Sequence, residues 1–340
     1  MPVTDSGRRA EVRALTRPGA TLMATLALGL LAILAWEASA QEWGDAIAAG
    51  VRITWPTASA GLALVGLAAV HFVSAALAVR SVSGRRLPLR STAYSQLAAA
   101  ATNRIVPNGI GGAGVTLRYL LRAGLHLGAA SSALATLAVV GAITDAAYAT
   151  AVTSAGPALG VPGAATELRN LTARGVGTGT HTAWLLIAAL LAVCAVTVIR
   201  YRRTTVAAIT TGIRAGIAHM RALAGHPWRI GGALLASMLT TAAMSTGFLV
   251  AVHTWGSAHT PLPAGALIAV YLLAATLGGA TPLPPFVGVT ETALVAGLIL
   301  GGYSSASAIL TVVVFRLITY WLPLPLGVLA ARNLRTKALL

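Results

Sequence analysis

The sequence predicts an all-α polytopic membrane protein, and two observations carry this prediction. First, 56% of the 340 residues are hydrophobic and only 9% are charged, which is far from the mixture used by water-soluble domains. Second, the apolar residues form stretches close to the roughly 20 residues that a helix needs to cross a bilayer. The net charge of +16 therefore does not indicate a nucleic-acid partner, because the basic residues stand in short clusters beside these stretches.

Six apolar stretches are predicted to be full transmembrane helices. In chain order they cover residues 20–36, 57–79, 128–152, 182–199, 230–254 and 304–330. The first also resembles a secretory signal, because Ala38-Ser-Ala40 mimics a cleavage site. We expect this helix to be retained, since its apolar run exceeds the roughly 7–15 residues of a typical signal sequence.

Two further apolar stretches, 91–125 and 264–302, are interrupted near their middle. The first contains Pro107-Asn-Gly-Ile-Gly-Gly-Ala-Gly114, and the second contains Pro282-Leu-Pro-Pro-Phe-Val-Gly-Val-Thr-Glu291. Proline cannot continue a helix, and glycine permits a turn that other residues resist. The prolines, Pro282 and Pro284 among them, are therefore expected to end a helix at membrane depth, and Gly288 to permit the turn that follows.

The arginines orient the predicted helices, because positive charge in short loops stays on the cytoplasmic side of a membrane. Basic clusters within 8–17, 80–90, 200–229 and 332–337 place both termini in the cytoplasm. The predicted organisation is a basic N-terminus (1–19), a single transmembrane domain (20–331) and a short basic tail (332–340).

Alternation of the six spans requires each broken stretch to return to the side from which it entered. Both are then re-entrant and oppositely oriented, which gives an inverted-repeat-like core. Such paired, interrupted segments indicate a transporter binding site. The competing interpretation is that each broken stretch forms two ordinary short spans.

Six charged residues remain within apolar segments once the topology is assigned: Arg104, Arg118, Arg122, Arg316, Asp145 and Glu291. An ionisable group inside a membrane is costly, so each is a functional candidate. Most of them also have a purely structural explanation. Arg122 could extend to the interface, Glu291 could form a structural ion pair with Arg118 or Arg316, and Thr144 and Tyr148 could satisfy Asp145.

The glycines of the first break offer a second recognition element. Gly109, Gly111 and Gly112 let backbone N–H groups approach a ligand and present a helix N-terminus to an anion such as phosphate. No lysine follows them, so the pattern is not a nucleotide-binding P-loop. Close packing of helices through small residues explains the glycines nearly as well.

In order and spacing, these motifs resemble the flippase-like transmembrane region of the lysylphosphatidylglycerol synthase family. The similarity covers Pro107 to Gly112 followed by Arg118, the second break up to Glu291, and Arg316-Leu-Ile-Thr-Tyr-Trp-Leu-Pro323. It implies a lipid translocation domain, with Arg118, Glu291 and Arg316 matching the family's functional polar residues. Pro285-Phe286 replaces the family's usual Gly-Gly, which predicts a stiffer turn or a different headgroup.

We therefore expect a flippase that moves an anionic phospholipid or a polyprenyl-phosphate-linked lipid across the bacterial plasma membrane. Aminoacylated phosphatidylglycerol is one candidate cargo. The predicted substrate-binding residues are Arg118, Glu291, Arg316, Asp145, Arg104, Gly109, Gly111, Gly112, Pro107, Pro282, Pro284, Gly288 and Trp321.

No catalysis, metal or cofactor is expected, because the two-domain members of the family carry a soluble aminoacyltransferase domain that the short tail after residue 330 cannot form. The expected partners are lipids with an anionic headgroup. Homo-oligomer formation and association with enzymes of envelope lipid or glycan synthesis stay open. The alternative functions are secondary transport of a small soluble anion and a non-transporting scaffold for cell-envelope assembly.

Overall fold

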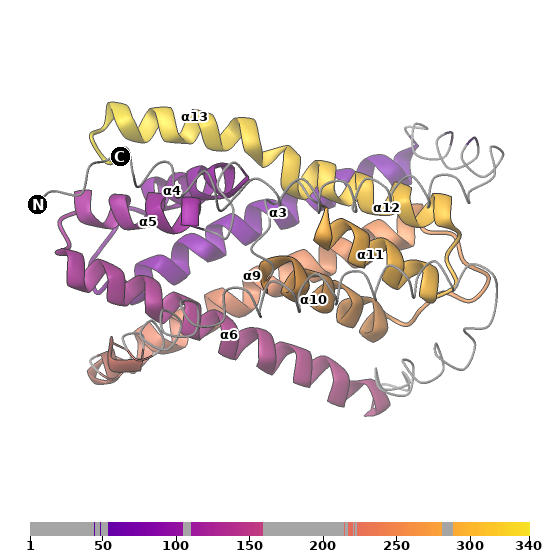
Figure 1. Cartoon of the computed structure of the whole chain (residues 1–340), viewed down its shortest axis with the longest axis horizontal. Coiled ribbons are helices and arrows are strands. Elements are labelled where there is room, and N and C mark those ends of the chain that lie inside the picture. Colours follow the sequence, from indigo (N-terminus) through magenta and orange to yellow (C-terminus); the bar gives the residue numbers. More distant parts are fainter. Residues whose placement is uncertain are drawn as a thin grey trace, which may run out of the picture.

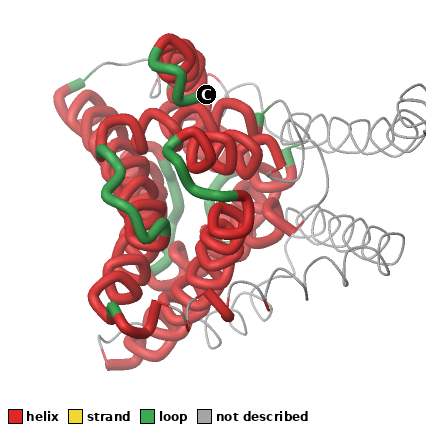
Figure 2. The backbone as a smooth tube through the Cα atoms, turned by 90° about the vertical axis from the view of Figure 1, so that its left-hand side faces the viewer, coloured by secondary structure: helices red, strands yellow, loops and turns green. Residues whose placement is uncertain are grey.

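The computed structural model describes residues 54–104, 110–158, 223–280 and 288–340, together with the isolated positions 44, 48, 214, 217–219 and 221. Helices make up most of this part of the chain, and short loops join them, as Figure 2 shows. The long helices run roughly along the longest axis of the molecule (Figure 1). The prediction of an all-helical membrane protein is confirmed for these residues.

Within the described ranges, four helices are long and apolar enough to cross a membrane. They are α3 (Trp55–Val82), α6 (Leu127–Ala158), α9 (Pro227–Trp255) and the continuous helix formed by α12 (Ser305–Arg316), a π-helical turn (Leu317–Trp321) and α13 (Pro323–Thr336). They confirm the predicted spans at 57–79, 128–152, 230–254 and 304–330. The predicted spans at 20–36 and 182–199, and the basic N-terminus, lie outside the described residues.

The first broken stretch forms two short helices, α4 (Leu89–Asn103) and α5 (Ile110–Arg122), which pack against each other. The interruption lies where the sequence predicts it, between Asn103 and Ile110. The ends of this pair meet, because Nη1 of Arg85, before α4, donates a hydrogen bond of 2.9 Å to the carbonyl of Ala123, after α5. The stretch is therefore a helical hairpin.

The second broken stretch has the same design. Helix α10 (Ala264–Ala280) ends just before the prolines, and α11 (Val289–Leu300) begins after Gly288. Gly288 has a φ of 76°, a left-handed conformation that glycine adopts without strain, so the predicted turn glycine is confirmed. The ends of this pair also meet, because the N–H of Ser304 donates to the carbonyl of Ser257 over 3.3 Å.

The two hairpins occupy opposite halves of the long axis in Figure 1, with α4 and α5 in one half and α10 and α11 in the other. All four of these helices are shorter than the roughly 20 residues of a typical transmembrane helix. The longest, α10, has 17 residues and spans about 26 Å at about 1.5 Å per residue, against a hydrocarbon core of about 30 Å.

The basic clusters that the structure describes gather at the end of the molecule that holds α4 and α5. The ring of His219 lies 3.1 Å from the carbonyl of Val82, which brings the segment before α9 to the end of α3. Leu334 of α13 packs in one buried cluster with Val82 and Leu120. The segments 80–90, 214–229 and 332–337 therefore lie on one side, as the charge distribution predicts.

Candidate functional site

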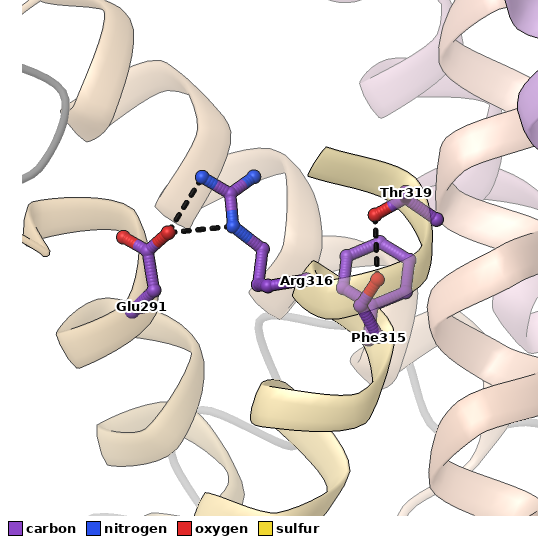
Figure 3. Close-up of polar contacts among 4 residues, drawn as sticks. All are labelled: Glu291, Phe315, Arg316 and Thr319. Carbon is purple, nitrogen blue, oxygen red and sulfur yellow. Dashed lines mark hydrogen bonds and ion pairs between the residues drawn. The ribbon is translucent and has the colours of Figure 1, made fainter. Parts of the chain in front are cut away.

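An ion pair joins the second hairpin to the helix that follows it. Nε and Nη2 of Arg316 both lie 2.6 Å from Oε1 of Glu291 (Figure 3). Glu291 lies in the first turn of α11, where the helix dipole favours a negative charge. The side chains of Arg316 and Glu291 are only 17% and 26% exposed. Of the two partners predicted for Glu291, the structure therefore places Arg316 beside it.

The π-helical turn that follows Arg316 has a cause in the sequence. Pro323 has no N–H for the carbonyl of Thr319, and in a regular α-helix its ring would clash with that carbonyl. The chain instead widens, and the N–H of Leu322 bonds to the carbonyl of Leu317, five residues earlier, over 2.8 Å. The hydroxyl of Thr319 donates to the carbonyl of Phe315 over 2.7 Å (Figure 3). Single π-helical turns within α-helices are frequent at functional sites.

Tyr320 lies within this turn and contacts two arginines. The guanidinium carbon of Arg316 is 4.0 Å from the centre of its ring, and that of Arg104 is 4.1 Å from the same centre. Arg104 directly follows α4, so the ring connects the first hairpin with the helix that binds the second. We refer to Glu291, Arg316, Tyr320 and Arg104 as the central cluster.

Tyr320 is not among the binding residues that the sequence predicts. A signal was present, because Arg316 and Tyr320 are four residues apart, the spacing at which two side chains meet on one helix face. The sequence also does not show that Arg104, rather than Arg118, belongs to the central cluster, because this depends on how α4 packs.

The central cluster carries an excess positive charge. Glu291 compensates one of its two arginines, and among the described residues no carboxylate pairs with Arg104. Nε of Arg104 is buried and has no hydrogen-bond partner in the described part of the chain. A buried donor without a partner is costly, and a guanidinium group is suited to binding oxyanions through two parallel hydrogen bonds. The cluster is therefore chemically suited to bind an anion.

The structure does not bring Arg118 to this cluster. The buried residues of α5 are Gly111, Gly112, Thr116, Tyr119 and Leu120, whereas Arg118 is exposed on the opposite face. Arg118 makes no hydrogen bond or ion pair with another described residue. Of the two arginines expected near Glu291, Arg118 is therefore not the partner, because the helical period of α5 directs its side chain away from the residues that α5 packs against.

Two of the predicted glycines have a packing role. A Cβ atom on Gly111 would lie 2.8 Å from the carbonyl oxygen of Thr102, and one on Gly112 would meet the side chain of Asn103. Oδ1 of Asn103 also accepts a hydrogen bond from the N–H of Gly112. This N–H group, at the start of α5, is thus already paired, and the packing alternative accounts for both glycines.

The predicted residues Pro107, Gly109, Pro282 and Pro284 lie outside the described part of the chain. Trp321 is 46% exposed and meets Tyr320 edge to face, with ring centres 5.5 Å apart. It supports the ring of Tyr320 from its neighbouring position in the π-helical turn.

Asp145 belongs to a separate row of polar contacts between α6 and α9. Its Oδ1 accepts a hydrogen bond of 2.6 Å from Thr241. Its predicted partners bond elsewhere: Thr144 to Ser237 over 3.0 Å, and Tyr148 to Ser245 over 2.9 Å. Hydrogen bonds of this kind join neighbouring helices in membranes. The expectation that Thr144 and Tyr148 satisfy Asp145 is therefore wrong, because Thr241 is the residue that donates to this carboxylate.

Comparison with known proteins adds one finding. A family described as the lysylphosphatidylglycerol synthase TM region matches residues 20–327, which include both hairpins and the whole central cluster. No curated protein matches the chain.

Proposed function

The chain belongs to the family of the lysylphosphatidylglycerol synthase transmembrane region, and we propose that it moves a lipid with an anionic headgroup between the leaflets of the bacterial plasma membrane. The observation that carries this proposal is the central cluster. Two arginines and one carboxylate meet where the first hairpin, the π-helical turn and the second hairpin come together. Ionisable residues are kept inside membranes mainly where they serve a pathway or a binding site.

The two hairpins supply the path. We propose that α4 and α5 enter the membrane from the cytoplasm, α10 and α11 enter it from outside, and both turn back at depth. The meeting of the two ends of each hairpin supports this arrangement. The end of the molecule with the gathered basic segments then faces the cytoplasm, and both termini lie there. Backbone that is not helical is tolerated at this depth where protein or a polar cavity satisfies it.

In this mechanism the headgroup enters the central cluster while the acyl tails stay in the lipid. The phosphate competes with Glu291 for Arg316, so that binding opens the ion pair and release closes it again. The pair is suited to this exchange because each state offers Arg316 an oxyanion partner, so the guanidinium group is paired both before and after binding. The chain acts here as a carrier and makes or breaks no covalent bond.

Lipid scrambling in proteoliposomes tests the proposal. Labelled anionic and zwitterionic lipids are followed between leaflets, and wild type is compared with Glu291→Gln and with Arg332→Gln, an exposed arginine at the basic end, as the matched control. We expect wild type and the control to move an anionic lipid, and Glu291→Gln to change the rate at least several-fold while the protein still inserts.

Two other outcomes would contradict the proposal. Uptake of a small soluble anion that depends on a proton gradient, without lipid movement, would identify a secondary transporter. If no lipid or soluble anion moves, and paired neutral replacement of Glu291 and Arg316 leaves cell-envelope assembly intact, the chain is a scaffold.

A further inference from the structure

The two arginines of the central cluster differ in how their hydrogen-bond donors are used. Arg316 directs Nε and Nη2 to the carboxylate of Glu291. Nε of Arg104, the corresponding atom, is buried and has no hydrogen-bond partner among the described residues. The edge of a guanidinium group that includes Nε can bind an oxyanion through two hydrogen bonds, and Arg316 turns this edge to Oε1 of Glu291. Nε of Arg104 is therefore a donor of the same kind as Nε of Arg316, but it has no carboxylate such as Glu291 beside it in the part of the chain that the structure describes.

The ring of Tyr320 limits how far apart the guanidinium groups of Arg104 and Arg316 lie. Their guanidinium carbons cannot be more than about 8 Å apart, because each lies about 4 Å from the same ring centre. Like charges at this separation repel each other within a membrane protein. The negative face of an aromatic ring attracts cations, so the ring of Tyr320 offsets part of this repulsion. Replacing the ring by an aliphatic side chain would let the two cations separate.

The charges of the cluster limit the kind of anion that it can hold. Two guanidinium groups and one carboxylate leave a single positive charge. One negative charge makes the cluster neutral, whereas two would leave an uncompensated negative charge at a depth where charge is costly. A phosphodiester carries one charge, and a phosphomonoester carries about 1.5 to 2 at neutral pH.

We propose that Arg104 and Arg316, which both contact the ring of Tyr320, form one site for a singly charged oxyanion, which favours a phosphodiester over a phosphomonoester. Arg104 binds the anion first, because it has no carboxylate to give up, and Arg316 follows as it leaves Glu291. Tyr320 is a positioning residue that acts through the two arginines. This inference rests on the proposed function, because it describes the headgroup site of the same carrier.

Binding to the purified full-length chain, measured by calorimetry in detergent, tests the site separately from transport. The probes are dihexanoyl phosphatidylglycerol, a soluble phosphodiester lipid, and dihexanoyl phosphatidic acid, the corresponding phosphomonoester. Glycerol phosphate and inorganic phosphate distinguish a lipid headgroup from a free anion. We expect wild type to prefer the diester lipid over all three other probes.

Variants identify the residues of the site. Arg104→Gln should weaken binding of the diester by about 10- to 100-fold, the value of a hydrogen-bonded charged group. Arg104→Lys should fall between wild type and Arg104→Gln, because lysine keeps the charge but not the two-pronged geometry. Tyr320→Phe keeps the ring and should bind within about 3-fold of wild type, whereas Tyr320→Leu should lose about 10-fold, within the range of cation–π contacts.

The preference between the diester and the monoester should depend on the charge of the cluster. Glu291→Gln gives the cluster a second positive charge and should shift the preference from the diester towards the monoester, an effect that a merely structural role for Glu291 would not produce. Equal binding of the diester by wild type and Arg104→Gln, or by Tyr320→Phe and Tyr320→Leu, would overturn the inference. Binding without lipid movement in proteoliposomes would overturn the proposed function and leave this site intact, and tighter binding of inorganic phosphate would identify a free anion as the ligand.

Discussion

The carboxylate of Glu291 and the guanidinium group of Arg316 are joined through one carboxylate oxygen: both nitrogens of Arg316 lie 2.6 Å from Oε1. The strongest arginine–carboxylate pairs instead use two parallel hydrogen bonds to two oxygens. The pair in this protein is therefore specific in its partners but does not have the most stable geometry. This geometry suits the proposed exchange, in which the contact opens for a phosphate and closes on its release.

A double-mutant cycle measures how strongly the two residues interact. We expect Arg316→Gln and Glu291→Gln each to lower stability, since each leaves a charge without its partner. The double variant should recover part of the loss, with a coupling of about 0.5–3 kcal/mol. Thermal unfolding of the detergent-purified variants provides the measurement. Strictly additive effects would show that the contact contributes nothing to stability.

Gly111 and Gly114 form a matched pair on α5. Alanine at Gly111 would place its Cβ 2.8 Å from the backbone oxygen of Thr102, and backbone yields less easily than a side chain. We expect Gly111→Ala to cost about 1–3 kcal/mol through overpacking. Around Gly114 there is open space, so Gly114→Ala should be neutral or stabilise the helix by up to about 1 kcal/mol. Thermal unfolding compares the two, and equal effects would show that α4 and α5 pack less closely than described.

Cysteine labelling tests the direction of the two hairpins. In a Cys194→Ser background, single cysteines replace Arg86 and His126 at the ends of the first hairpin, and His259 and Ser304 at the ends of the second. All four positions are exposed. We expect a membrane-impermeant thiol reagent to reach the first two from one side of sealed vesicles and the last two from the other. If the two ends of one hairpin react from opposite sides, that stretch crosses the membrane once and is not re-entrant.

Much of this architecture follows from the sequence, because hydropathy and helix-breaking residues act locally. The long apolar runs, the interruption before Ile110 and the left-handed turn at Gly288 each depend on a few neighbouring residues. The central cluster was harder to predict, because it depends on which helices pack together. The burial pattern of α5 could have excluded Arg118 from the core, but no local pattern reveals that Arg104 and Arg316 share the ring of Tyr320.

The π-helical turn offers a direct test of how the fold positions this ring. Pro323→Ala restores an N–H that can bond to the carbonyl of Thr319, so the turn can close to a regular α-helix. A regular α-helical turn holds about one residue fewer than a π-helical turn, so closing the turn would rotate α12 relative to α13 by about 100°. Because α13 packs on α4, this rotation would move Tyr320 relative to Arg104. We expect lipid binding to fall at least several-fold while stability stays equal or rises, since proline inside a helix is unfavourable.

Pro325→Ala is the control, because Pro325 lies beyond the hydrogen bond between the N–H of Leu322 and the carbonyl of Leu317. Its replacement should leave lipid binding unchanged. If Pro323→Ala binds the lipid as tightly as wild type, the ring of Tyr320 is held by its contacts with the arginines rather than by the shape of the helix.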